Sequence, residues 1–323
     1  MANIDLSIII PSKNNKKKIS RIICDVAASL ENTEAEFIII DMNSTDKSVI
    51  TALDTLKKNN LRGYVIQNGS GNVSSALNTG IYRSNGKYIS FLFMNRLYKN
   101  YLSDFLCTAD NSNADFVFYA NEETKAKLTL KDVFREKSKN KEQYTSDSVW
   151  LLCQLLRSDI YFDFNTVMFR REFILEKGIK FYEDFNYGYA EAFIYNTLLN
   201  SPEIACCETK PEYDNINSTA NDEAVPNTSC YGRIDSMVKI YENSLSLHPD
   251  NRYLNELFEY RKLPAVVMSV IKILTKGEFS YAAIKRSFKQ KGYNKLLKTS
   301  RLTPPELRKE IFIWNKLPWL YKP

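Results

Sequence analysis

The sequence of 323 residues is poor in the groups that hydrolytic and zinc-dependent chemistry need. It has a single histidine, His248, in the segment Leu247-His248-Pro249-Asp250. A Ser-His-Asp triad or a histidine-rich zinc site would have to use this residue, and we interpret it instead as a turn residue between helices. The six cysteines show no Cys-x-x-Cys or other metal-ligand spacing, which favours reduced thiols in a cytoplasm.

Long hydrophobic runs are missing as well. The apolar stretch 264–274 is interrupted by Lys272 and is too short to span a bilayer. The N-terminus has no basic region followed by a hydrophobic run, so we expect no signal peptide. Gly69 and Gly71 lack the spacing of a phosphate-binding fingerprint and are predicted to form a turn that enters a helix. With 44% hydrophobic and 25% charged residues, the chain is predicted to be a folded cytoplasmic protein.

The first hundred residues contain apolar runs that end repeatedly in short polar loops. The runs at 6–10, 37–40 and 87–93 are typical of strands, and each is followed by a polar loop. Between them, residues 19–30 and 49–56 show the apolar spacing of one buried helix face. Strands that alternate with helices predict an α/β fold with a mostly parallel sheet covered on both faces. Because ligands of such sheets bind at the carboxyl ends of the strands, we expect the chemistry in these loops.

Several short segments stand in a set order along residues 4–200. They read IIIPSKN at 8–14, IIDMNSTD at 39–46, SALNTGI at 75–81 and GKYI at 86–89, then FRREF at 169–173 and GIKF at 178–181. In order and spacing they resemble the family 2 glycosyltransferases. The first three correspond there to a strand with a Pro-Thr-Tyr-Asn loop, to Val-Val-Asp-Asp-Gly-Ser-Thr-Asp and to Ala-Arg-Asn-x-Gly-Ile.

The resemblance implies a fold and an activity. The fold is GT-A, a Rossmann-like, mostly parallel sheet with helices on both faces, here followed by a C-terminal helical tail. The activity is an inverting transfer of a sugar from a nucleotide-activated donor, a UDP-sugar, to a glycan or lipid-linked acceptor. Such enzymes commonly use Mg²⁺ or Mn²⁺, and many build bacterial surface polysaccharides.

The chain departs from the family at its charged positions. Where the family has Asp-x-Asp, whose carboxylates hold the metal, the chain has Phe93, Met94 and Asn95. Met42 replaces the second Asp of Asp-Asp-Gly-Ser, and Leu77 replaces the Arg before Asn78.

The acceptor half departs too. The family reads Gly-Glu-Asp there, with the Asp as general base, whereas this chain reads Gly188-Tyr189-Ala190 followed by Glu191. A shift of one residue on a helix turns a side chain by about 100°. We retain Glu191 as the candidate base.

The resemblance assigns candidate residues to the donor pocket: Pro11, Ser12, Lys13, Asn14, Asp41, Ser44, Asn78 and Asn95. Alternatively, Asp41 forms an Asx turn or a helix cap, and Ser44 and Asp46 can also be helix caps. Asn14 and Asn78 can each simply hold the loop in which they lie. We favour binding for Asp41 and capping for Asp46.

Two sources of positive charge for the leaving diphosphate are considered. The first is a divalent cation ligated by the amide oxygen of Asn95. The second is a metal-independent clamp formed by Arg96, as a catalytic residue, or by Lys13, because a guanidinium can bridge phosphate oxygens. Alternatively, both cations are solvated loop residues.

Three consecutive parts are predicted: a nucleotide-sugar-binding half at 1–120, an acceptor-binding half at 121–230 and a basic helical region at 231–323. From Arg261 onward the chain has fifteen Lys and Arg against three Glu, a net charge of +12 in a chain of net +6. A basic amphipathic helix around 284–298 can lie on an anionic membrane at its inner face. Alternatively, it caps the catalytic domain or meets another subunit. The acidic remainder and the lack of a recognition motif exclude nucleic acid as an expected partner.

Two functions remain open from the sequence. The first is an active sugar transferase with altered metal and base residues. The second is a catalytically silent glycosyltransferase-like subunit that binds a partner transferase or a glycan, because a fold that keeps its scaffold and loses its charged residues fits such a role.

Overall fold

The computed structural model describes residues 4–30, 33–69, 71–94, 97–119, 147–185, 187–214, 227–277 and 279–318. The chain forms two compact units that alternate along the sequence. Unit 1 comprises Met1–Glu136, Phe162–Glu183 and Pro202–Ala220, and unit 2 comprises Lys137–Tyr161, Asp184–Ser201 and Asn221–Pro323. The three consecutive functional parts inferred from the sequence stay a prediction.

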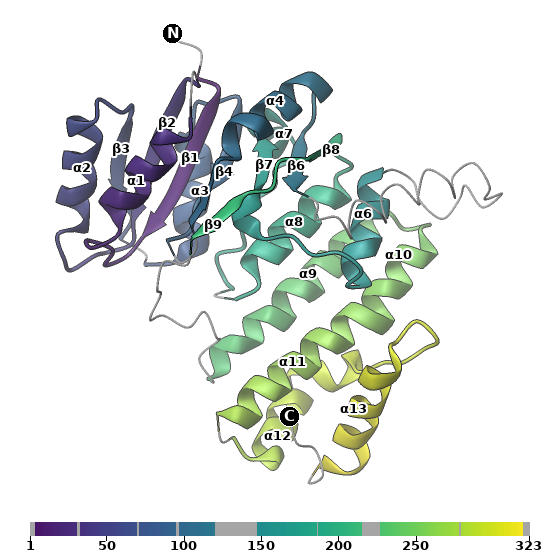
Figure 1. The fold of residues 1–323 in the computed structure, drawn as a ribbon. Coiled ribbons are helices and arrows are strands. Elements are labelled where there is room, and N and C mark those ends of the chain that lie inside the picture. Colours follow the sequence, from purple (N-terminus) through teal and green to yellow (C-terminus); the bar gives the residue numbers. More distant parts are fainter. Residues whose placement is uncertain are drawn as a thin grey trace. The chain divides into compact units, whose positions relative to one another are not determined.

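Unit 1 is built on a seven-stranded sheet in the order β3-β2-β1-β4-β7-β6-β8 (Figure 1). The strands are β1 (Leu6–Ser12), β2 (Ala35–Asp41), β3 (Gly63–Gln67), β4 (Tyr88–Phe91), β6 (Phe116–Tyr119), β7 (Val167–Arg170) and β8 (Ile204–Cys207). Strands β3, β2, β1 and β4 are parallel, and only β7 runs against its neighbours. A separate two-stranded sheet pairs β5 (Leu97–Lys99) with β9 (Glu212–Asp214). The predicted α/β class with a mostly parallel sheet is confirmed.

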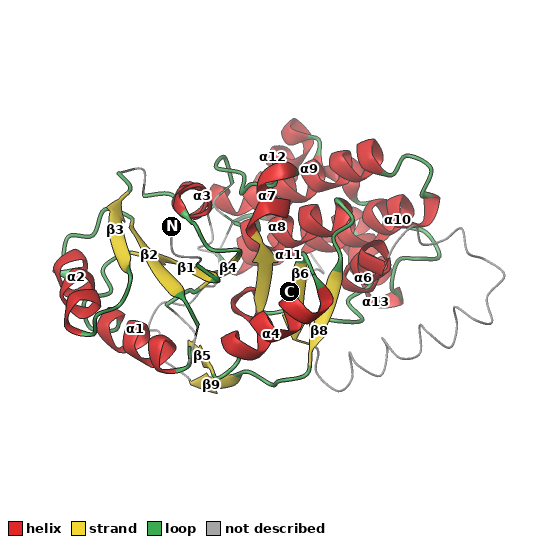
Figure 2. Cartoon of the chain, turned by 90° about the horizontal axis from the view of Figure 1, so that it is seen from above, coloured by secondary structure: helices red, strands yellow, loops and turns green. Residues whose placement is uncertain are grey.

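Helices cover both faces of this sheet, as the apolar spacing predicted. On one face lie α1 (Ile19–Ala28), α2 (Ser48–Lys58) and α4 (Leu102–Ser112), and on the other lie α3 (Val73–Arg83) and the short α7 (Arg171–Glu176) (Figure 2). The predicted buried face of α1 is confirmed, because Ile19, Ile22, Ile23 and Val26 are each at most 1% exposed. Each such side chain contributes about 1.5–3 kcal/mol by its burial.

Gly80 allows α3 to lie close against β1. A Cβ at this position would overlap the side chain of Ile9, which is itself fully buried in the sheet. The glycine of the Asn-x-Gly segment therefore serves the packing of the sheet against the helix that carries Asn78.

Unit 2 is helical. Its α-helices are α6 (Asp147–Leu156), α8 (Tyr189–Leu199), α9 (Gly232–Leu247), α10 (Arg252–Leu257), α11 (Leu263–Lys276), α12 (Tyr281–Lys291) and α13 (Pro305–Lys316). Helix α9 packs against α8 and α11. A π-helical turn, η4 (Phe258–Lys262), joins α10 to α11 and ends in Lys262. Within the described residues, no helix is both long and apolar enough to cross a membrane.

The basic helix α12 turns its apolar residues into unit 2. Ile284 and Phe288 are 1% and 2% exposed, and the ring of Phe288 lies 5.7 Å from the ring of Tyr231. The Tyr231 hydroxyl also donates to Ser287 at 2.9 Å. The apolar side that the sequence offered to a membrane is thus occupied by the protein's own core.

Candidate functional site

The loops after β1 and β2 are tied together at the carboxyl edge of the parallel strands. The Asn14 amide donates to Ser44 Oγ at 2.9 Å, and the Thr45 amide donates to Asn14 Oδ1 at 2.8 Å. The two strand ends also pair directly, because the Met42 amide donates to the Ser12 carbonyl at 2.8 Å. The structure therefore brings together five of the predicted donor residues, namely Pro11, Ser12, Asn14, Asp41 and Ser44.

Asp41 lies at the centre of these contacts with one carboxylate oxygen unsatisfied. The residue is 2% exposed, and its Oδ2 accepts the Ser44 amide at 3.1 Å, as in the predicted Asx turn. Its Oδ1 is buried and has no hydrogen-bond donor among the residues that the structure describes. Because a buried polar atom without a partner is costly, this oxygen is suited to accept a hydrogen bond from a bound ligand.

Asp46, in the loop before α2, accepts hydrogen bonds from two backbone amides. Its Oδ1 accepts the Ser48 amide at 2.9 Å, and its Oδ2 accepts the Lys16 amide at 3.1 Å. The hydrogen bond from the Ser48 hydroxyl, followed by those two amides, lowers the pKa of the Asp46 carboxyl. The N-cap position of α2 is Lys47, so Asp46 holds the loop just before the helix and is not the predicted cap.

Lys13 is an available cation beside these loops. Its side chain is exposed and makes no ion pair or hydrogen bond with any residue in the described ranges. Pro11 and Ser12 are buried at the end of β1, so they shape the loop from which Lys13 extends. This arrangement leaves an ammonium group free for an anion at the carboxyl edge.

Asn78 is fully engaged within unit 1. Its Nδ2 donates to the Phe181 carbonyl at 2.9 Å and to Glu183 Oε1 at 3.0 Å. Its Oδ1 accepts the Phe181 amide at 2.9 Å. Asn72 adds a parallel contact from the start of α3, because its Nδ2 donates to the Glu183 carbonyl at 2.8 Å. These contacts fix segment 181–183 against α3. Asn78 therefore holds a loop, which is the alternative to donor binding given for it above.

The first carboxylate position of the family's Asp-x-Asp motif and the position after it hold the apolar side chains of Phe93 and Met94. The ring of Phe93 lies 5.8 Å from that of Phe164, and Met94 is 7% exposed within the hydrophobic core. Met42 packs with Ile38 on the other face of the sheet. Across the described ranges, no group of three or more His, Cys, Asp or Glu side chains is placed to hold a metal ion. The described residues therefore do not fit Mg²⁺ or Mn²⁺, which prefer several oxygen ligands.

Asn95 and Arg96, the predicted metal ligand and leaving-group clamp, lie outside the described residues. Their roles stay predictions.

Asn165 positions the end of β4, and the sequence did not reveal it. Its Oδ1 accepts the Phe93 amide at 2.8 Å, and its carbonyl accepts the Tyr101 hydroxyl at 2.6 Å. Asp163 holds the Asn165 side chain through a hydrogen bond of 3.0 Å. The Asp-x-Asn pattern was visible in the sequence, but its contact with a strand 72 positions earlier was not.

Glu191 belongs to a charged network inside unit 2. It lies in the first turn of α8, where Gly188 precedes the helix with a positive φ of 78°. The carboxylate forms a salt bridge with Lys262, and the Tyr195 hydroxyl donates to it at 3.0 Å. Both hydrogen bonds end on Oε1, so Oε2 has no donor within the part of the chain that is described.

The network keeps Glu191 ionised. Burial raises the pKa of this carboxyl, but the charge of Lys262 and the hydrogen bonds from Lys262 and Tyr195 outweigh it, so the pKa lies below its usual value. Burial and the neighbouring Glu191 charge raise the pKa of Tyr195 well above 10. At neutral pH the site thus holds a carboxylate, a phenol and an ammonium group.

Comparison with known proteins places this geometry in a family context. Residues 7–92 match the family model "Glycosyl transferase family 2". The poly(ribitol-phosphate) beta-N-acetylglucosaminyltransferase TarP of Staphylococcus aureus (strain N315) is 26% identical over 211 residues, which are 64% of this chain. The match takes in 61% of that protein's length, so the chain corresponds to about three fifths of that relative.

Solved structures share the fold over nearly the whole chain. The S. aureus TarS fragment 1–349 in complex with UDP-GlcNAc has a TM-score of 0.66 at 14% identity, covering 97% of this chain and 87% of that one. The mannosyltransferase PcManGT of Pyrobaculum calidifontis, in complex with GDP-Man and Mn²⁺, has a TM-score of 0.50 at 13% identity, covering 98% and 85%. Residues 7–92 are thus similar to glycosyl transferase family 2, and the fold of the chain is that of the GT-A glycosyltransferases.

Proposed function

We propose that this chain transfers a sugar, with inversion, from a UDP-activated donor to a polyol-phosphate or lipid-linked glycan acceptor in surface polysaccharide synthesis. The family assignment supports a nucleotide-sugar donor. Two relatives support the finer choice: TarS was solved with UDP-GlcNAc, and TarP is a poly(ribitol-phosphate) beta-N-acetylglucosaminyltransferase.

The observation that carries the proposal is the unsatisfied oxygen of Asp41 at the joined ends of β1 and β2. A nucleotide offers hydrogen-bond donors on its base and ribose, and either can pair with Asp41 Oδ1. Lys13 supplies a free positive charge at the same edge for the diphosphate. Donor recognition thus rests on a carboxylate for the nucleoside and a cation for the phosphates.

The proposed reaction is a single displacement at the anomeric carbon. The acceptor hydroxyl oxygen forms the new bond while the bond to the UDP oxygen breaks, and the acceptor proton passes to Glu191. Its lowered pKa keeps Glu191 unprotonated, and its free Oε2 can accept the proton. A positioned base of this kind typically accelerates a reaction by about 10²–10⁴-fold.

Donor binding is proposed to be independent of a divalent cation. Phe93, Met94 and Met42 occupy positions where the family has or flanks carboxylates, and all three are packed among apolar side chains. Positive charge on the diphosphate then comes from side chains, with Lys13 and the predicted Arg96 as candidates.

Calorimetry with UDP tests the proposal. Equal UDP affinity in EDTA and in excess Mn²⁺ is expected, together with release of UDP when UDP-GlcNAc and a ribitol-phosphate oligomer are supplied. Binding that appears only with Mn²⁺ would contradict metal-independent binding. Failure to bind UDP under either condition would contradict the proposal as a whole.

A second candidate function is a glycosyltransferase-like subunit without activity. It is favoured by one observation: Met42, Leu77 and Phe93, at positions charged in the family, are buried or packed against aromatic rings. UDP binding without turnover, combined with capture of a partner transferase, would support this alternative.

A further inference from the structure

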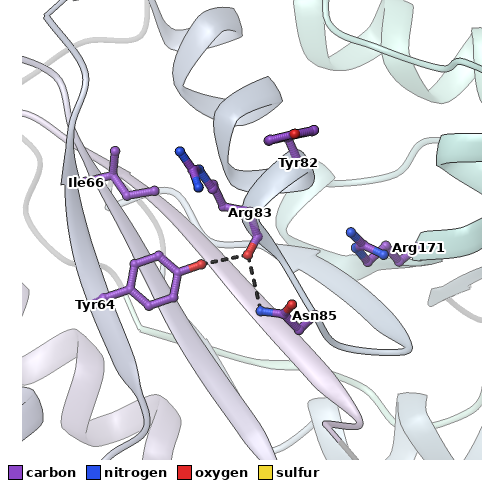
Figure 3. Close-up of a pocket in the computed structure, with 6 residues that line it drawn as sticks. All are labelled: Tyr64, Ile66, Tyr82, Arg83, Asn85 and Arg171. Carbon is purple, nitrogen blue, oxygen red and sulfur yellow. Dashed lines mark hydrogen bonds between the residues drawn. The ribbon is translucent and has the colours of Figure 1, made fainter. Parts of the chain in front are cut away.

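A pocket on the α3 side of the unit 1 sheet has no part in the proposed reaction. It is lined by Tyr64, Ile66, Tyr82, Arg83, Asn85 and Arg171, and we call it the arginine pocket (Figure 3). Tyr64 and Asn85 stand near the amino ends of β3 and β4, whereas Asp41 ends β2. Asn85 bonds to Glu36, five residues before Asp41 on β2, so this end of the pocket lies about 17 Å from the donor loops. At its other end, Ile66 pairs with Ile40, directly before Asp41.

The pocket carries positive charge that no acidic side chain among the described residues neutralises. The Arg83 side chain makes no hydrogen bond or ion pair with them, and the Arg171 side chain makes one hydrogen bond, of 2.9 Å from Nε to Ser84 Oγ. That bond leaves most of the Arg171 donors free and fixes its direction. The pocket therefore presents two guanidinium groups to solvent.

A second hollow beside the arginine pocket is lined by two basic side chains, Lys87 and Arg170, that form salt bridges. There Lys87 pairs with Asp110 at 2.5 Å, and Arg170 pairs with Asp115. The carboxylate beside the arginine pocket, Glu36, is 3% exposed, and its Oε1 accepts the Ser7 hydroxyl at 2.6 Å and the Asn85 amide at 2.7 Å. Glu172 and Glu176 on α7 line the neighbouring hollow and form no salt bridge with Arg171.

Two tyrosines, Tyr64 and Tyr82, add aromatic rings to the lining. Tyr82 is 75% exposed, and its ring faces the Arg83 guanidinium at 5.9 Å. Tyr64 donates to the Arg83 carbonyl at 2.6 Å, which fixes the end of α3 against β3 (Figure 3). An open pocket of about 690 Å³ with an exposed ring and two unpaired guanidinium groups suits a chain that alternates carbon segments with anionic groups.

We propose that the arginine pocket binds a segment of a phosphodiester-linked polyol chain, remote from the transferring end. Arg83 and Arg171 bind successive phosphates, and Tyr82 packs against the polyol carbons between them. The inference rests on the proposed function for the nature of the acceptor. Its consequence is that long acceptors bind more tightly than short ones.

Binding of a fluorescent ribitol-phosphate dodecamer tests the proposal. The variants are R83Q, R171Q and the double variant, and K58Q is the control, because Lys58 is an exposed, unpaired cation on α2 of the same unit. We expect the double variant to bind at least tenfold more weakly and K58Q to bind within twofold of wild type. The Arg83 side chain forms no hydrogen bond within the described residues, so we expect R83Q to fold as wild type does, and its unfolding transition in urea checks this.

If the double variant binds the dodecamer as tightly as wild type does, the proposal is overturned. Equally tight, arginine-dependent binding of a polygalacturonate of matched length would overturn the phosphate assignment. Because the readout is binding, it stands whether or not the chain transfers a sugar. With an active enzyme, R83Q should raise KM for the dodecamer and leave the KM for a ribitol-phosphate dimer unchanged.

Discussion

At the scale of single residues, Asp41 combines two roles that the sequence presented as alternatives. One carboxylate oxygen closes the Asx turn by accepting the Ser44 amide, and the other is buried without a partner among the described residues. A short side chain at a strand end can thus shape its own loop and still bind a ligand.

Replacing Asp41 by Asn separates these roles. The amide oxygen of Asn can still accept the Ser44 amide, while an NH₂ group replaces the free carboxylate oxygen. We expect UDP to bind about 10–100-fold more weakly, because a hydrogen bond to a charged group contributes about 1.5–3 kcal/mol. Calorimetry measures this, and S44A is the control for the loop. An UDP affinity within twofold of wild type would show that Asp41 serves the turn alone.

Glu191 and Lys262 make a prediction about pH. Lys262 lowers the pKa of Glu191 against the opposing effect of burial, so K262M should raise that pKa. A base must be unprotonated to act, and the acidic limb of kcat/KM should therefore move to higher pH in K262M. The matched control is K272M, because Lys272 on α11 forms a salt bridge of 2.8 Å with another glutamate, Glu310 on α13. An unchanged limb would remove Glu191 as the base.

The same pair affects stability with a defined sign. Because the folded pKa of Glu191 lies below its unfolded value, the stabilisation is present at neutral pH and is lost as the pH falls through the folded pKa.

E191Q should lower kcat by about 10²–10⁴-fold and leave the affinity for UDP unchanged.

At the scale of elements, local spacing predicted most of unit 1 and missed its long-range contacts. The predicted helices at 19–30 and 49–56 correspond to α1 and α2, because buried residues recur with helical period. The predicted strand at 87–93 ends earlier, at Phe91, since the amide of Phe93 pairs with the distant Asn165. The hydrophobic periodicity of a sequence cannot predict a contact between residues so far apart along the chain.

Asn78 shows the same limit for the candidate site. Its place in an Asn-x-Gly segment identified it as a donor residue by resemblance, and that role stays a prediction. Its three hydrogen bonds with segment 181–183 join positions more than 100 residues apart, which a single sequence cannot reveal. By contrast, the clustering of Ser12, Asp41 and Ser44 followed directly from the parallel strand order.

Asn78→Ala should therefore lower stability more than donor binding. Three hydrogen bonds at about 1 kcal/mol each predict a loss of about 2–3 kcal/mol in the free energy of unfolding. Urea denaturation measures it, and T79A is the control, because the Thr79 hydroxyl bonds only to the Ser75 carbonyl within α3. Unchanged stability with a raised KM for the donor would assign Asn78 to the pocket instead.

At the scale of the whole molecule, charge is separated along the chain. Residues from Arg261 onward carry a net charge of +12, and the rest of the chain is acidic. In unit 2 some of these cations are paired, as Lys298 is with Glu259. Others are exposed and unpaired in the described part of the chain: Arg286, Lys289, Lys295 and Arg301. Because Ile284 and Phe288 are buried, the apolar side of α12 is not available to a membrane, and we expect its exposed cations to make the contact.

This arrangement predicts adsorption to a membrane without insertion. We expect the protein to float with vesicles rich in phosphatidylglycerol at low salt, and to be released in 0.5 M NaCl, where charges are screened within a few ångströms. Each Lys or Arg near an anionic surface contributes about 1 kcal/mol, so R286E/K289E should bind at least tenfold more weakly. K57E/K58E on α2 makes the same charge change elsewhere and should bind as wild type does. Binding that survives high salt would contradict a purely electrostatic contact and would point to exposed apolar side chains such as Phe312. Protein that stays at the bottom of the gradient at low salt would leave α12 as a cap on its own unit.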